Sequence, residues 1–204
     1  MIDVSRRAII IQPPKTGGQA LQRALGLGRD LVTAHGVRRH DTIEQALSKV
    51  PNPMEWRRFI LIRNPFARIV SIYHYHVQYP HRRETEARQY LQGFGNCRDF
   101  LHNADFDRLS TAQNPDFRQQ LVDPCAMFGY IDGEYDESLV EIRTETLSTD
   151  AQRWFGLPGV DLFLTSDHEP WPTYFDDRAA DRVIDYFGED FERFGYSADW
   201  RAYL

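Results

Sequence analysis

Four consecutive residues near the N-terminus have the chemistry of an anion-binding turn: Lys15, Thr16, Gly17 and Gly18. The glycines allow the backbone to approach a ligand closely, while lysine supplies a mobile positive charge and threonine a hydroxyl donor. A helix that begins here would add free N–H groups and a dipole that favours negative charge. The pattern therefore predicts a site for a phosphate or sulfate group. It is not a Walker A loop, because its lysine precedes the glycines and no glycine lies upstream.

A second junction of the same kind begins at Arg63. The apolar run 59–62 is typical of a buried strand, and Pro65 suits the first position of a following helix. An arginine at the carboxyl end of a strand can make a two-pronged contact with a phosphate. Ser71 lies two turns into the expected helix, on a side that could face back toward Arg63. The alternatives are a salt bridge for Arg63 and a simple packing role for Ser71.

Together the two junctions resemble the sulfotransferase family. Residues 14–18 resemble the family's loop for the 5′-phosphosulfate, and residues 63–73 resemble its 3′-phosphate motif. Residues 143–147 and 190–196 are similar to later family segments, so the likeness extends from residue 8 to about residue 196. The best match is the branch of carbohydrate sulfotransferases and their bacterial relatives.

The resemblance implies a donor, a product and a fold. The donor is 3′-phosphoadenosine 5′-phosphosulfate (PAPS), and the product is adenosine 3′,5′-bisphosphate (PAP), with no metal required. The implied architecture has three layers, with a mainly parallel central sheet flanked by helices, as in P-loop nucleotide hydrolases. The donor would bind to a set of seven residues: Lys15, Thr16, Gly17, Gly18, Gln19, Arg63 and Ser71.

The loop departs from the family pattern on both sides of the lysine. This chain has Gln12-Pro13 where relatives often have His-Ile, and Gln19-Ala20 where they often have Thr-Ser. Two hydroxyls that could touch the phosphosulfate are therefore missing. Each hydrogen bond to a charged group contributes about 1.5–3 kcal/mol, so donor affinity or turnover is expected to fall unless Gln19 or an arginine substitutes.

Sulfuryl transfer to a hydroxyl requires positive charge at the leaving group and a base at the acceptor. Lys15 is expected to supply the charge. His40 is the favoured general base, because relatives often carry a histidine in this place and the ordinary pKa of histidine is close to neutrality. His35 is the second choice, and His74, His76 and several carboxylates are further candidates. The alternative for His40 is a surface histidine near a helix start.

The elements that must position these residues alternate between short strands and amphipathic helices, which predicts an α/β fold with a mainly parallel sheet. Strands are expected at 7–12, 59–62, 139–143 and 161–164. Helices are expected from the loop to about residue 27, at 41–50, from residue 65 to Pro80, at 148–155 and at 176–187. Asp41 is the expected N-cap of the second helix, paired with Glu44. Gly188 is expected to end the last one.

Length and composition restrict the class of protein. The 204 residues suit a single domain, 1–204, and the net charge of −6 disfavours a nucleic-acid partner. The two cysteines, Cys97 and Cys125, are too few for a disulfide framework and do not match a zinc-binding pattern. The apolar runs are too short for a membrane span or a signal peptide. We expect a soluble, cytoplasmic enzyme that acts on a hydroxyl or an amine of a small acceptor or a glycan.

Two other functions fit parts of this pattern. One is a P-loop-type kinase that uses ATP, although the lysine order and the lack of an evident magnesium-binding carboxylate argue against it. The other is a catalytically silent nucleotide-binding module, which the Gln19-Ala20 departure would suit. Turnover separates the leading hypothesis from the silent module, and nucleotide preference separates it from the kinase.

Overall fold

The computed structural model describes residues 1–28, 34–78, 86–110, 122–161 and 167–204. The chain forms two compact units and passes between them more than once. The first unit comprises Met1–Arg63 and Cys125–Phe163, and the second comprises Asn64–Pro124 and Leu164–Leu204. This division into two compact units does not test the prediction of a single domain, which stays a prediction.

The first unit is built on a four-stranded sheet of order β1-β2-β3-β6. Its strands are β1 (Ile2–Asp3), β2 (Ala8–Ile11), β3 (Arg57–Ile62) and β6 (Val140–Arg143). β2 pairs parallel to β3, and β3 pairs parallel to β6, while β1 adds an antiparallel edge. The predicted α/β class with a mainly parallel sheet is confirmed. Sequence reasoning overlooked β1, which has only two residues.

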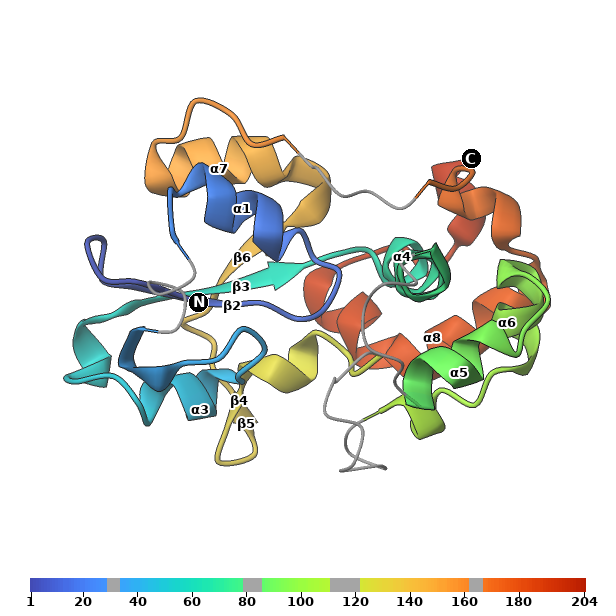
Figure 1. Ribbon diagram of the computed structural model, residues 1–204, viewed down its shortest axis with the longest axis horizontal. Coiled ribbons are helices and arrows are strands. Elements are labelled where there is room, and N and C mark those ends of the chain that lie inside the picture. The colour runs from blue at the N-terminus through green and yellow to red at the C-terminus, as the bar shows by residue number, and fades with distance from the viewer. Residues whose placement is uncertain (29–33, 79–85, 111–121, 162–166) are drawn as a thin grey trace. The chain divides into compact units, whose positions relative to one another are not determined.

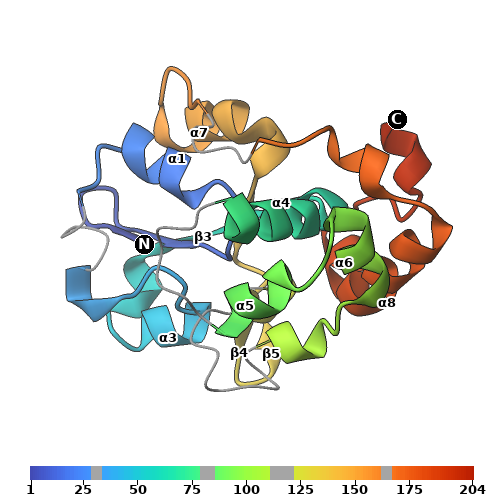
Figure 2. The same cartoon turned by 45° about the vertical axis from the view of Figure 1, so that its right-hand side comes forward.

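Helices cover both faces of this sheet. α1 (Gly18–Ala24) and α7 (Leu147–Phe155) lie on one side, and α3 (Ile43–Leu47) lies on the other (Figures 1 and 2). Alternate strand residues form a buried cluster with the first two helices: Ala8, Ile10, Phe59, Leu61 and Ile142 from the strands, Leu21 from α1 and Ala151 from α7. The intervening isoleucines of β2 and β3 point to the opposite face, as strand alternation requires. Strands buried on both faces explain the continuous apolar runs.

The parallel register places three strand ends at one edge of the sheet. Ile11 pairs with Ile60 across β2 and β3, and Ile62 pairs with Arg143 across β3 and β6. The Thr144 hydroxyl donates to the Ile62 carbonyl at 2.9 Å, which fastens the ends of β3 and β6 together. The two predicted junctions therefore leave the same edge of one sheet.

The start of α3 differs from the prediction. Thr42, not Asp41, is the N-cap, and its capping-box partner is Gln45, not Glu44. Asp41 instead accepts hydrogen bonds from the Arg38 N–H at 2.6 Å and from Lys49 Nζ at 2.5 Å. Those contacts take the carboxylate away from the helix start and leave the capping role to its neighbour. The helix also ends at Leu47, three residues before the expected end.

A two-stranded antiparallel hairpin completes the first unit. Its strands are β4 (Tyr130–Ile131) and β5 (Glu134–Tyr135). Asp132 and Gly133 form the turn, with φ values of 50° and 84°. Positive φ at both central residues is the conformation of a tight hairpin turn.

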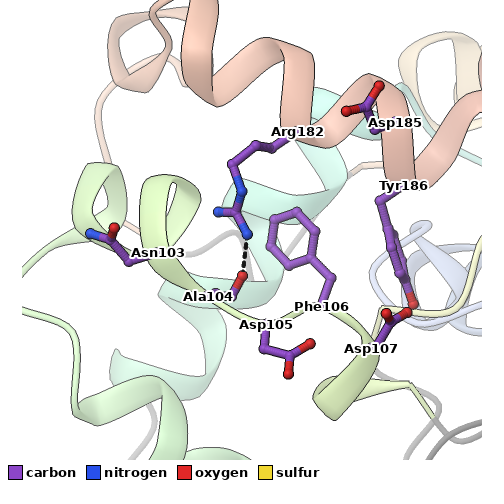
Figure 3. A pocket seen from close by; sticks show the side chains of 8 residues that line it. All are labelled: Asn103, Ala104, Asp105, Phe106, Asp107, Arg182, Asp185 and Tyr186. Atoms are coloured by element: carbon purple, nitrogen blue, oxygen red, sulfur yellow. Dashed lines mark hydrogen bonds between the residues drawn. The ribbon is translucent and has the colours of Figure 1, made fainter.

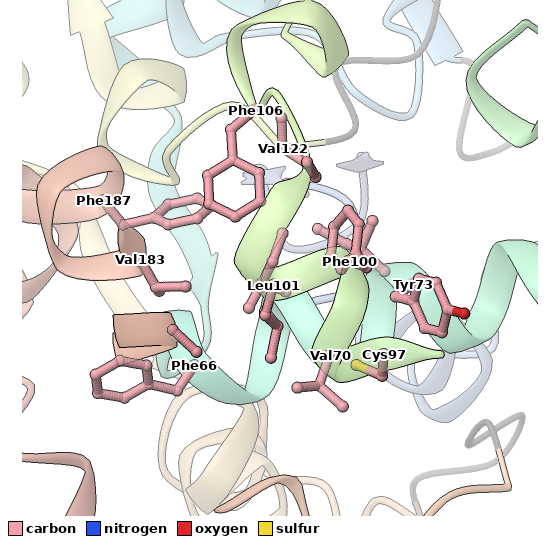
Figure 4. Close-up of a cluster of buried hydrophobic side chains, with 14 of the residues drawn as sticks. Phe66, Val70, Tyr73, Cys97, Phe100, Leu101, Phe106, Val122, Val183 and Phe187 are labelled. Atoms are coloured by element: carbon pink, nitrogen blue, oxygen red, sulfur yellow. The ribbon is translucent and has the colours of Figure 1, made fainter. Parts of the chain in front are cut away.

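The second unit is helical. It contains α4 (Pro65–Gln78), α5 (Glu86–Gln92), α6 (Cys97–Asn103) and α8 (Asp177–Phe194), with a 3₁₀ turn at Trp171–Tyr174. Its core is rich in aromatic side chains from α4, α6 and α8 (Figure 4). Phe66 contacts the rings of Trp171, Phe175 and Phe191 at centroid distances of 4.8–5.7 Å. Cys97 in this unit and Cys125 in the first unit are both buried.

Two predicted helix boundaries in this unit have different outcomes. Pro65 is the first residue of α4, as predicted. The last helix does not end at Gly188, since α8 continues to Phe194 and Gly195 provides the left-handed C-cap. The helix is distorted at Phe187, where φ is −103° and ψ is 21°. Phe191 and Phe194 are buried beyond that point, and their packing stabilises the helix past Gly188.

Some predictions concern segments outside the described residues. The helix end expected at Pro80 falls there, as does the strand expected at 161–164 from residue 162 on. Among the helices that are described, none combines the length and apolarity needed to cross a membrane.

Candidate anion-binding site

The loop between β2 and α1 has the backbone of an anion cradle. Lys15 and Gly17 are both left-handed, with φ values of 65° and 79°, and Thr16 between them is not. Residues of alternating hand turn successive N–H groups toward one side, which forms a concave site for anions. Gly17 is also the N-cap of α1, and no side chain caps this helix start. The Ala20 N–H already donates to the Gly17 carbonyl at 3.0 Å, so only the N–H groups before it could serve another acceptor.

Lys15 adopts a conformation that disfavours any residue with a Cβ. The left-handed region costs such a residue about 1–2 kcal/mol relative to a right-handed backbone. Glycine would fit this position without strain. A half-buried lysine in this conformation makes Lys15 a candidate functional residue of the loop.

Thr16 has a structural hydrogen bond within the loop. The residue is fully buried, and its hydroxyl donates to the Pro13 carbonyl at 2.7 Å. This bond closes the turn on itself and holds the chain between the strand and Gly17. The predicted contact from the Thr16 hydroxyl to a ligand stays a prediction. The predicted contact from Gln19, which is half-buried, also stays a prediction.

Gln12 is a site residue that sequence reasoning treated only as a departure from a pattern. Its side chain is 2% exposed and lies against Gly18, where a Cβ would come within 2.4 Å of Gln12 Oε1. Gln12 Nε2 is buried and has no hydrogen-bond partner. The sequence could have indicated its direction, because Gln12 comes two residues after Ile10 and alternate strand residues share a face.

Arg63 connects the second junction to the first. It follows β3 directly and is half-buried, and its Nη1 donates to the Lys15 carbonyl at 3.2 Å. The left-handed backbone at Lys15 accompanies this contact. Arg63, the residue of the second motif that belongs to the first unit, is therefore joined to the first motif. At the start of α4, the Asn64 side chain caps the helix by accepting from the Phe66 N–H at 2.9 Å.

His40 lies beside the same loop. Its Nδ1 is 2.7 Å from the Gln12 carbonyl oxygen. A carbonyl only accepts, so Nδ1 carries the proton and Nε2 is the ring nitrogen that can accept one. The neighbouring carboxylate of Asp41 fixes this segment through Arg38 and Lys49. The favoured base is thus brought to the loop by a main-chain contact.

The other histidines have different surroundings. His35 is exposed, has a left-handed φ of 58° and packs edge-on against Trp56 with ring centroids 5.9 Å apart. His74 belongs to α4 in the second unit and stacks on His168 with centroids 4.6 Å apart. Burial and the neighbouring His168 lower the pKa of His74 to about 4. His76 is half-buried on the same helix.

Ser71 is the predicted donor-binding residue that belongs to the second unit. It lies within α4 and is buried. The remaining predicted site residues, from Lys15 to Gln19 with His40 and Arg63, belong to the first unit. The proposed role of Ser71 stays a prediction.

The second unit has a cavity of about 490 Å³ between α6 and α8 (Figure 3). Arg182 lines it, donating Nη1 to the Leu101 carbonyl and Nη2 to the Ala104 carbonyl. Its lining contains none of the predicted site residues and consists of Asn103, Ala104, Asp105, Phe106, Asp107, Arg182, Asp185 and Tyr186. In the part of the chain that the structure describes, no three His, Cys, Asp or Glu side chains are grouped to hold a metal ion.

No family model, curated protein or solved structure matches the chain.

Proposed function

We propose that this protein is a sulfotransferase that moves a sulfuryl group from PAPS to a hydroxyl of a carbohydrate or another small acceptor. The observation that carries the proposal is the hydrogen bond from Arg63 Nη1 to the Lys15 carbonyl. It joins the 5′-anion loop and the arginine of the expected 3′-phosphate motif at one edge of a parallel sheet. Open α/β sheets bind ligands beyond the carboxyl ends of their strands, which is where both motifs lie. The finer fold, a P-loop-type sulfotransferase fold, is part of the same proposal.

The loop residues fit the anionic end of such a donor. Lys15 brings positive charge, and the alternating backbone hand around Thr16 brings N–H groups to one side. No side chain caps the start of α1, and Gln12 Nε2 has no hydrogen-bond partner, so a bound acceptor could satisfy both. Each of these features favours a bound phosphate or sulfate group over a neutral ligand.

The loop and His40 would have distinct roles in the transfer. The donor supplies a sulfuryl group attached to a phosphate that leaves with the electron pair of the broken S–O bond. Lys15 and the loop N–H groups stabilise the negative charge that grows on that phosphate oxygen. His40 Nε2 accepts the proton of the acceptor hydroxyl as its oxygen forms the new S–O bond, while Nδ1 remains held by the Gln12 carbonyl.

Calorimetric titration tests the proposal by comparing PAP, AMP, 3′-AMP and ATP. We expect PAP to bind most tightly, because it alone offers a phosphate to both the loop and Arg63. Arg63→Ala should lower the affinity for PAP at least about tenfold and bring it close to that for AMP, since a hydrogen bond to a charged group contributes about 1.5–3 kcal/mol. Arg57→Ala is the matched control: Arg57 lies at the other end of β3, where its guanidinium covers the Phe59 ring at 5.0 Å.

Three outcomes would contradict the proposal. A preference for ATP would favour the kinase. PAP binding without sulfuryl transfer to any acceptor would favour the silent module. Unchanged selectivity for the 3′-phosphate in Arg63→Ala would overturn the assignment of Arg63.

A further inference from the structure

The amide of Gln12 is an unusual group to find inside this loop. It is 2% exposed, and its Nε2 is buried with no hydrogen-bond partner. Buried amide donors in folded proteins are almost always satisfied, because leaving one unpaired costs stability. An orphan donor next to a candidate ligand site therefore has a natural explanation, which is that the ligand provides the acceptor.

The position of this amide is defined from several sides. Gln12 follows β2 directly, and its side chain reaches the first residue of α1, where Gly18 leaves no room for a Cβ. Gly18 would place a Cβ 2.4 Å from Oε1, 2.9 Å from Cδ and 3.2 Å from Cγ of Gln12. The end of the Gln12 side chain thus lies against Gly18, the residue that directly follows the turn of Lys15, Thr16 and Gly17. The main-chain carbonyl of the same residue accepts from His40 Nδ1.

We infer that Gln12 Nε2 donates a hydrogen bond to the anionic group that the loop binds, the 5′-phosphosulfate of the donor or the 5′-phosphate of the product. The inference rests on the proposed function for the identity of that anion. An amide nitrogen can only donate and an anion can only accept, so the pairing has the required sense. In a water-poor site, a donor that no protein group uses interacts strongly with a charged acceptor.

This role joins three parts of the site in one residue. The Gln12 side chain contacts the anion, its backbone carbonyl orients His40, and its stem packs on the first residue of α1. Gln12 is therefore a specificity residue for the 5′ anion and a positioning residue for the expected base. The two roles are separable, because a side-chain substitution leaves the carbonyl in place.

The test is the variant Gln12→Met, which keeps the length of the side chain and removes its polar end. We expect the affinity for PAP to fall at least about tenfold, the value for one hydrogen bond to a charged group. The affinity for 3′-AMP, which lacks the 5′-phosphate, should be unchanged. The melting temperature of the ligand-free protein should be unchanged or higher, because the substitution removes an unsatisfied buried donor.

The control is Gln22→Met on α1. Gln22 Nε2 donates to the Leu27 carbonyl at 3.2 Å, so this amide already has a partner in the protein. The control should lower the melting temperature and leave the PAP affinity unchanged. The opposite pattern of effects in the two variants separates a ligand-binding amide from a structural one.

The inference is overturned if Gln12→Met binds PAP as tightly as the parent protein, loses equal affinity for both nucleotides, or melts at a lower temperature. A parent protein that does not bind PAP would instead overturn the proposed function. Inorganic pyrophosphate then decides the inference: Gln12→Met should weaken its binding at least about tenfold. The inference also fails if pyrophosphate binds neither protein.

Discussion

The contact between Gln12 and Gly18 can be measured by a double-mutant cycle. Gly18→Ala adds one methyl group at a point 2.4 Å from Gln12 Oε1 and 2.9 Å from its Cδ. Gln12 is 2% exposed, so its amide has little space into which it can move. Overpacking of this kind costs about 1–3 kcal/mol. The φ of Gly18 is not positive, so alanine suits the backbone and returns about 0.5–1 kcal/mol of helix propensity.

These two terms predict that Gly18→Ala destabilises the parent protein by up to about 2.5 kcal/mol. In a Gln12→Ala background the obstructing atoms are gone, and only the gain in helix propensity remains. The effect of Gly18→Ala should therefore differ between the two backgrounds by about 1–3 kcal/mol.

The assay is chemical denaturation of the parent protein, both single variants and the double variant. Tryptophan fluorescence reports on the first unit through Trp56 and Trp154 and on the second through Trp171 and Trp200. A coupling below about 0.5 kcal/mol would mean that the two sites are independent. That result would refute the packing of Gln12 on Gly18 and remove the geometric basis of the inference drawn from it.

Three further predictions concern single side chains. Lys15→Gly and Lys15→Ala should lose sulfuryl transfer equally. Chemical denaturation should show that the glycine variant is more stable than the alanine variant by about 1 kcal/mol, because φ at this position is 65°. Equal stability of the two variants would contradict the left-handed backbone at Lys15. His40→Ala should abolish transfer while calorimetry still detects PAP binding, and a parallel loss of binding would contradict its role as base. The pKa of His74 is lowered from 6.5 to about 4 by burial and by His168, so the unfolded chain binds this proton more readily and stability should fall as the pH drops from about 6.5 toward 4. In His74→Phe the urea midpoint should fall less between pH 7 and pH 5 than in the parent protein, and an equal fall would contradict this assignment.

The strands and the main helix starts could be predicted because their signals are local. The isoleucine run before Gln12 and the run ending at Ile62 lack polar interruptions, as strands buried on both faces do. Pro65 marked the start of α4 because its fixed φ suits a first helical position. Gly156, left-handed at the end of α7, stopped that helix as expected.

The start of α3 could not be predicted because the sequence satisfies the capping pattern in two registers. Asp41 with Glu44 and Thr42 with Gln45 both have the required three-residue spacing. The choice depends on Lys49, whose ammonium holds the Asp41 carboxylate. That contact forms only when the folded segment brings the two side chains together.

Two other misses have different causes. Gly188 disfavours a helix locally, but the burial of Phe191 and Phe194 extends α8 beyond it. The hairpin turn at Asp132-Gly133 has a recognisable two-residue signal that sequence reasoning passed over. The first miss is a tertiary effect, whereas the second could have been avoided.

The candidate site was predictable in its residue types but not in its connections. The sequence indicates that Lys15 and Arg63 belong to two similar junctions. The bond between Arg63 and the Lys15 carbonyl depends on the strand register and on a left-handed backbone at a lysine. The orphan amide of Gln12 likewise depends on how closely α1 begins to the end of β2. Such close approaches are set by the folded chain as a whole.

The most direct test of the central claim is a crystal structure of the protein with PAP. We predict that the 5′-phosphate lies in the loop of Lys15, Thr16 and Gly17 at the start of α1, and that the 3′-phosphate contacts Arg63. A nucleotide bound elsewhere, or one with its 5′-phosphate outside this loop, would contradict the account.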